Sequence, residues 1–144
     1  MREMYPKLLK YHKWWYAKRD HDKNHICEFG SVDGTLVAAA WESGMDNAIR
    51  FDGTKMLQNG PDAWSTDQES VDLNAYLSLE YTLLKKFAAL LDEPFLLPDY
   101  RSMVADYFFD KKDGFFYDRR MNATRDFVRE AGCEGYIPFW ANIA

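Results

Sequence analysis

Residues 70–91 read SVDLNAYLSLEYTLLKKFAALL, and this stretch carries the strongest structural signal in the chain. Its apolar side chains recur at the spacing of an α-helix, at Val71, Leu77, Leu84 and Leu91. The sequence DEPFLLP, which follows directly, contains prolines that stop a helix. We therefore expect one long helix over residues 70–91.

Further helices are expected on either side of this segment. Residues 3–18 have apolar side chains at helical spacing, with Pro6 in the first turn, where proline is tolerated. Pro98 suits the start of a helix over residues 99–109. Residues 36–41 are expected to form either a short helix or an extended entry into the polar motif that follows.

Polar, glycine-containing segments separate these helices and are expected to be loops. They cover residues 19–35 and 59–67. Towards the C-terminus, DKKDGFFYDRR is expected to form a turn and an extended aromatic segment, with which Phe127 and Val128 pair. The coarse expectation is a mainly α fold, in which long loops between the helices carry a site.

The composition limits the classes of protein to which the chain can belong. Its 144 residues suffice for one domain, and 47% hydrophobic with 28% charged residues is typical of a globular chain. A net charge of -5 offers no basic face for nucleic acid. No apolar run approaches the ~20 residues of a membrane helix. Cys27 and Cys133 are expected to be free thiols, although one disulfide is an open alternative.

The segment DHDKNHICE, residues 20–28, has the oxygen spacing of a cation loop. Oxygen ligands stand at alternating positions: Asp20, Asp22, Asn24, the carbonyl of Ile26, and Glu28. Such a set can wrap a hard cation such as calcium. It is not an EF-hand, because His25 replaces the glycine and Ser31 the bidentate Glu, so a further carboxylate must come from elsewhere. A solvated acidic turn is the alternative.

The segment WESGMDNAIRFD, residues 41–52, combines a ring, carboxylates, an amide and a guanidinium. Hydrolysis of a glycosidic bond needs two carboxyl groups, one of them protonated, and neighbouring polar groups that bind sugar hydroxyls. Trp41 offers a stacking face. The segment has the parts of such a site. On its residues alone a surface helix cap is equally favoured, because Asp and Asn are common at caps and turns.

WESGMDNAIRFD resembles the signature of glycoside hydrolase family 63, in particular its bacterial glucosidase and mannosylglycerate hydrolase-like branch. EMYPKLLKYHKWW and RDHDKNHICEFG resemble the helix and calcium loop of the family's catalytic domain. QESVDLNAYL, GFFYDRR and GCEGYIPFW are similar to later landmarks of the family in the same order. Together these segments cover nearly the whole chain.

This resemblance implies a fold, an activity and a set of site residues. The fold is part of an (α/α)6 toroid, with residues 1–144 forming a portion of the catalytic domain that is truncated at both ends. The activity is hydrolysis of α-glycosidic bonds with inversion, on an α-glucoside or α-mannoside. Asp46 is implied as the general acid, and the base as a Glu on a C-terminal segment outside the chain. The sugar-binding residues are implied to be Trp41, Glu42, Asn47, Arg50, Glu134, Tyr136 and Trp140.

The resemblance also bears on the cation loop. It implies calcium as a cofactor, held by the five loop residues Asp20, Asp22, Asn24, Ile26 and Glu28, and it adds Glu69 as the outside carboxylate. The family often has Gly where this chain has Lys23 and His25. Both residues are therefore expected to need an unfavourable positive φ.

Two further expectations concern partners. A second hypothesis is a non-catalytic, calcium-stabilised helical module that acts in binding or assembly. Apolar stripes that neighbouring helices of a toroid would cover predict self-association of the chain as a homo-oligomer, without glycosidase activity of its own. These stripes carry Trp14, Trp15, Leu83, Phe87, Phe108 and Phe109.

Overall fold

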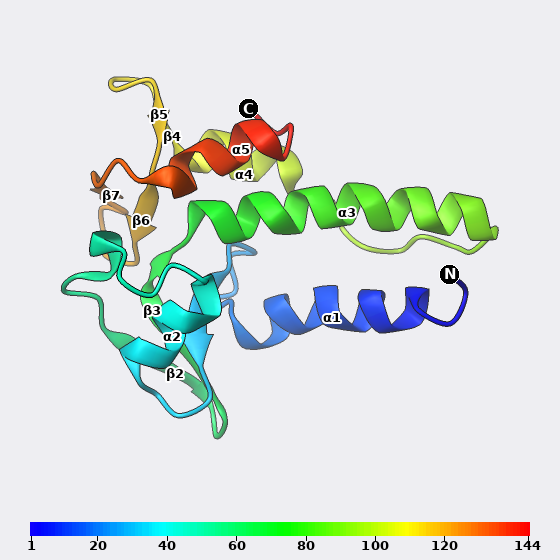
Figure 1. Cartoon of the computed structure of the whole chain (residues 1–144), viewed down its shortest axis with the longest axis horizontal. Coiled ribbons are helices and arrows are strands. Elements are labelled where there is room, and N and C mark those ends of the chain that lie inside the picture. Colours follow the sequence, from blue (N-terminus) through cyan, green and yellow to red (C-terminus); the bar gives the residue numbers. More distant parts are fainter.

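The structure is a computed structural model that describes residues 1–144. Helices α1, α3, α4 and α5 lie side by side with the longest, α3, in the middle, while α2 lies beside the strands (Figure 1). Helix α1 lies along one side of α3, and α4 and α5 lie on the other (Figure 1). The bounds are α1 Tyr5–Lys18, α2 Leu36–Ser43, α3 Val71–Leu91, α4 Arg101–Phe108 and α5 Ile137–Trp140. None of these helices combines the length and hydropathy that a bilayer crossing requires.

An antiparallel sheet lies at the end of the layer where α3 begins (Figure 1). Its central strand pairs with β1 on one edge and with β2 and then β6 along the other, and β7 continues from β6. The strands are β1 Glu28–Ser31, β2 Met56–Gly60, central β3 Ala63–Glu69, β6 Asp118–Arg120 and β7 Phe127–Val128. A separate two-stranded hairpin joins β4 Phe109–Asp110 to β5 Phe115–Phe116.

The sheet corrects the expected fold class. A mainly α fold that forms part of an (α/α)6 toroid is wrong, because the chain has a mixed architecture of helices and antiparallel strands. Residues 19–35 and 59–67, expected as loops, contain β1 and most of the β2–β3 hairpin. These strands lack the alternation of apolar and polar residues that identifies a strand, because β3 buries Thr66, Gln68 and Glu69.

The helices follow the sequence more closely. Residues 3–18 and 70–91 form α1 and α3 within a few residues of the expected bounds, and residues 99–109 contain α4. Of the two alternatives for residues 36–41, the structure shows the short helix, which is α2. Thr35 caps the start of this helix, because its side chain accepts a hydrogen bond from the Ala38 N–H. The expected pairing of Phe127 and Val128 with the aromatic segment is confirmed by the β6–β7 ladder.

The core consists of three clusters of apolar side chains, which are packed between the helices and strands. The largest joins α1, β1, α2 and α3 through residues such as Trp15, Phe29 and Leu77. Cys27 is buried in this cluster, whereas Cys133 is exposed. The two do not form a disulfide with each other, and both thiols are free, as expected.

The stripes from which self-association was predicted are mostly covered. Trp15 and Phe108 are buried, while Leu83 is exposed. Trp14, Phe87 and Phe109 are half-buried against core clusters. The prediction of a homo-oligomer therefore loses most of its stated basis.

Candidate active site and cation loop

The motif at residues 41–52 runs from the last turn of α2 into a short 3-10 helix, Ile49–Phe51. Gly44 ends α2 with a left-handed φ of 71°, which turns the chain away from the helix axis. Asp46 and Asn47 lie at the outside of the resulting bend and are exposed. The local backbone thus presents this carboxylate and amide to the surface.

A hollow of about 410 Å³ lies between this bend and the segment that precedes α5. One wall is formed by residues 45–50 and the other by residues 130–134. The hollow brings together four of the predicted site residues: Asp46, Asn47, Arg50 and Glu134. The other four, Trp41, Glu42, Tyr136 and Trp140, do not line it.

Glu134 is the buried acidic group of this hollow. The residue is 6% exposed. Its carboxylate lies against Gly132, where an added Cβ would be 2.2 Å from Oε2. A side chain at position 132 would therefore push the carboxylate out of its present place. Sequence reasoning found Glu134 but not this dependence on Gly132.

Arg50 lies at the floor of the hollow. Both terminal nitrogens of its guanidinium are paired with carboxylates, while its buried Nε has no hydrogen-bond partner. The guanidinium donates to both oxygens of Asp72, at 3.0 and 2.9 Å, and to Asp118 Oδ2 at 3.1 Å. Asp118 also accepts hydrogen bonds from the Val71 N–H and the Gln68 side-chain amide, both at 2.7 Å. Burial nevertheless raises the pKa of Asp118 to about 6. Arg50 thus ties the motif to α3 and β6, and its predicted contact with a sugar stays a prediction.

Glu42 is also committed to internal contacts. Arg19, buried at the end of α1, donates to both of its oxygens, at 2.7 and 2.9 Å. The Gly30 N–H of β1 donates to it at 2.7 Å. Gly30 leaves no room for a side chain, because a Cβ would lie 1.9 Å from the Trp64 carbonyl oxygen. Glu42 therefore anchors α2 to α1 and β1, and is a positioning residue for the motif.

The predicted aromatic residues stand on the outer surface. Trp41, Tyr136 and Trp140 are all more than 60% exposed. Trp140 meets Tyr76 edge to face, with ring centroids 5.9 Å apart. Exposed rings held in this way offer flat faces for stacking, although none of them lines the hollow.

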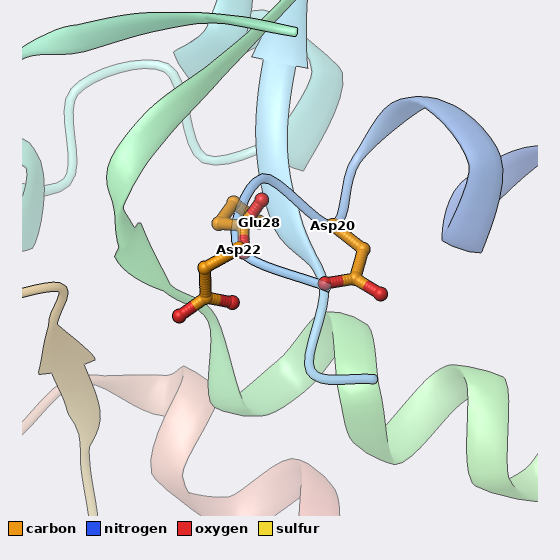
Figure 2. A group of neighbouring side chains, drawn as sticks. All are labelled: Asp20, Asp22 and Glu28. Atoms are coloured by element: carbon orange, nitrogen blue, oxygen red, sulfur yellow. The ribbon is translucent and has the colours of Figure 1, made fainter. Parts of the chain in front are cut away.

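The cation loop brings three of its predicted ligands together. One carboxylate oxygen each of Asp20, Asp22 and Glu28 lies within 4.8 Å of the others. Figure 2 shows Asp20 and Asp22 on the turn between α1 and β1, and Glu28 at the start of β1. Asp20 Oδ1 and Glu28 Oε1 are buried and have no hydrogen-bond partner. Burial raises the pKa of the Asp20 carboxyl and raises the pKa of Glu28 well above its ordinary value.

Buried carboxylate oxygens without donors are costly, and a bound cation would compensate them. The residues therefore fit a hard cation in this part of the loop. The loop backbone adds to the fit, because Lys23 and His25 adopt the expected positive φ, at 61° and 73°. The ring of His25 stacks on Tyr100, at 4.3 Å between centroids, which fixes this strained residue.

The other predicted side-chain ligands, Asn24 and Glu69, form hydrogen bonds with each other and with neighbouring protein groups. Asn24 accepts the Ile26 N–H with its amide oxygen at 2.8 Å, and donates to Glu69 Oε1 at 2.6 Å. Glu69 is fully buried and accepts further hydrogen bonds from the Tyr107 hydroxyl and from Arg125. Glu69 thus lies beside the loop, as the spacing required, but its oxygens are already paired.

No role was assigned from the sequence to three residues that are important here: Arg19, Asp118 and Arg125. Each acts on a partner far away in the chain, from 23 positions for Arg19 and Glu42 to 103 for Arg125 and Asp22. The sequence signals were the positions of Arg19 at the start of the RDHDKNHICEFG landmark and of Asp118 inside the GFFYDRR landmark.

Comparison with known proteins gives three findings. The family model described as the mannosylglycerate hydrolase MGH1-like glycoside hydrolase domain matches residues 1–144. A mannosylglycerate hydrolase from Thermus thermophilus is 32% identical over 56% of this chain and 20% of the relative. An uncharacterized conserved protein from another strain of Thermus thermophilus has a similar crystal structure, with a TM-score of 0.71 and 20% identity over 99% of this chain and 42% of that chain. The chain thus spans less than half the length of these relatives, and the likeness to the crystal structure shows the fold alone.

Proposed function

Because the chain belongs to the mannosylglycerate hydrolase MGH1-like glycoside hydrolase family, we propose that it forms the acid-bearing wall of a glycosidase active site. The resemblance drawn from the sequence motifs is confirmed at the level of the family. The observation that carries the proposal is the hollow in which Asp46, Asn47 and Glu134 face one space. The reaction proposed is hydrolysis of an α-glycosidic bond with inversion.

Asp46 is proposed as the general acid. An acid must reach the leaving oxygen of a bound sugar, and the exposed rim of the hollow gives this carboxyl that access. Its backbone is held on both sides. Glu42 is fixed by Arg19 and Gly30, and Arg50 by Asp72. Such fixation keeps a catalytic carboxyl close to its productive position.

The opposing base is proposed to be a Glu outside residues 1–144. Inversion places the two carboxyl groups ~6.5–9.5 Å apart, with a water between them. Glu134 is assigned a different role, as a buried acceptor for a sugar hydroxyl beside Asn47. A carboxylate at the bottom of a hollow can fix the orientation of a ring by accepting its O–H groups.

The substrate proposed is an α-mannoside or α-glucoside. The name of the curated relative, mannosylglycerate hydrolase, supports a mannoside. The exposed rings of Trp41, Tyr136 and Trp140 supply faces on which further sugar units stack.

We further propose calcium at the loop of residues 20–28. Asp20, Asp22 and Glu28 would hold it, with Asn24, the Ile26 carbonyl and Glu69 completing the set after reorientation. A bound cation supplies positive charge to buried carboxylates. The loop residues would then fix the end of α1 to the β1–β3 pair and the start of α3.

The test is turnover by the complete protein that carries this chain, on α-mannosides that include mannosylglycerate and on α-glucosides. Asp46→Asn should lower kcat by a factor of ~10²–10⁴, and Glu134→Gln should mainly raise KM. Asp52 is exposed and lies outside the hollow, so Asp52→Asn should act as the wild type. Proton NMR of the first product should show the inverted anomer. Sugar binding without any turnover would favour the non-catalytic module instead, and the retained anomer would contradict inversion.

A further inference from the structure

Arg125 occupies the outer side of the cation loop. It lies in the turn between β6 and β7, with a left-handed φ of 52°. Its guanidinium donates to Glu69 Oε1 at 3.0 Å and also to Asp22 Oδ2. The chain therefore brings a positive charge of its own to two of the six proposed calcium ligands.

The two sides of the loop differ in how their oxygens are satisfied. On the inner side, Asp20 Oδ1 and Glu28 Oε1 are buried and have no donor. On the outer side, Asp22 and Glu69 share an ion pair with the single positive charge of the guanidinium. A divalent cation that recruits the outer pair must take oxygens from Arg125, and it also repels that charge at short range.

The side chain of Arg125 borders on solvent. It is 33% exposed, whereas Glu69 is fully buried. The turn itself is held by its backbone, since the Arg125 N–H bonds the Asn122 carbonyl and the Arg125 carbonyl accepts from Arg119. Outward rotation of the guanidinium therefore leaves the β6–β7 turn in place.

We propose that Arg125 competes with the cation for this loop. It holds Asp22 and Glu69 together while the loop has no metal, and it turns into solvent when a divalent cation takes their oxygens. The inference rests on the calcium site proposed above. Loss of two partly exposed ion pairs lowers the affinity for calcium by about 2- to 30-fold.

The test is calorimetric titration of calcium into the wild-type chain and two variants. Arg125→Met removes the competitor. Arg129→Met removes the same charge from the same part of the chain, where Arg129 pairs with Asp110 and Asp113. Arg125→Met should bind calcium about tenfold more tightly than the wild type, and Arg129→Met should match the wild type. In the wild type, the NMR signals of the Arg125 guanidinium should change from paired to solvated as calcium is added.

The outcomes separate this inference from the proposals on which it stands. If the wild type binds calcium and Arg125→Met binds equally or more weakly, Arg125 is no competitor, although the site stands. An equal gain in both variants would reduce the effect to net charge and overturn the inference. Absence of binding in all three chains would remove both the calcium site and the inference, while the glycosidase assay of the complete protein decides the catalytic proposal by itself.

Discussion

Replacement of Arg50 by Met should destabilise the chain strongly. The guanidinium is 1% exposed and is the shared partner of two buried carboxylates, Asp72 and Asp118. Removal of one member of a buried ion pair leaves an uncompensated charge, at a cost of ~3–5 kcal/mol in the free energy of unfolding. Here two carboxylates lose their partner, so we expect the upper part of this range.

Urea unfolding followed by circular dichroism measures this loss directly. For a chain of this size the loss corresponds to a fall in Tm of roughly 6–20 °C. The control is Arg2→Met, which removes a pair with Glu93 whose side chains are 71% and 48% exposed. Such a surface pair contributes at most ~1 kcal/mol.

Neutralisation of the stranded carboxylates should restore part of the stability. In the Arg50→Met background, Asp72→Asn with Asp118→Asn removes the uncompensated charge while keeping acceptors for the Val71 N–H. A loss below ~1 kcal/mol for Arg50→Met, equal to the surface control, would refute the view that this triad ties the motif to α3 and β6.

Three other predictions concern catalysis, metal and pH. Asp46→Asn in the complete protein should lower kcat by a factor of ~10²–10⁴ with an unchanged melting curve; near-normal turnover on a substrate with a poor leaving group would remove Asp46 from the acid role. Calcium at a hundredfold excess over Kd should stabilise the chain by ~2.7 kcal/mol, seen as a higher Tm than in chelator; identical curves would contradict the site. Burial raises the pKa of Asp118 to about 6, despite Arg50 and the neighbouring Gln68 amide, so the folded chain takes up a proton near pH 4–6 that the unfolded chain does not. The wild type should therefore gain stability over Asp118→Asn as the pH falls from 7 to 4, measured by urea unfolding at each pH, and a gap that shrinks on acidification would show that the sign is wrong.

The helices could be predicted from sequence because their signal is local. Residues 70–91 show the period of a helix, and most of the apolar side chains of that period do face the core in α3. The sheet could not be predicted, because its central strand is held by polar groups rather than by an apolar face. Thr66 bonds the Phe29 carbonyl, and Gln68 bonds both Thr54 and Asp118. A buried polar strand of this kind looks like a loop when read alone.

The candidate site shows the same division. Asp20, Asp22 and Glu28 lie close in sequence, so their spacing was enough to predict a cluster. The family resemblance implied that Glu42 and Arg50 contact a sugar, but a sequence motif does not reveal which hydrogen bonds of these side chains are made within the protein. Arg19 and Asp118, which take them, become neighbours only through the tertiary fold.

The loop between Glu42 and Arg50 is a suitable target for protein engineering. Both of its ends are fixed, at one end to α1 and β1 and at the other to α3 and β6, and Asp46 stands midway between them. Gly44 has nothing within 4 Å of the place where a Cβ would stand, although its φ of 71° favours glycine. Ala48, in contrast, packs against the core, and Met45 contacts Arg50. Residues inserted beside Asp46 and Asn47, which are exposed, would shift the carboxyl while Glu42 and Arg50 keep their contacts. Libraries confined to positions beside Asp46 would alter the reach of the proposed acid, and with it the choice of leaving group, while Ala48 keeps its core contact.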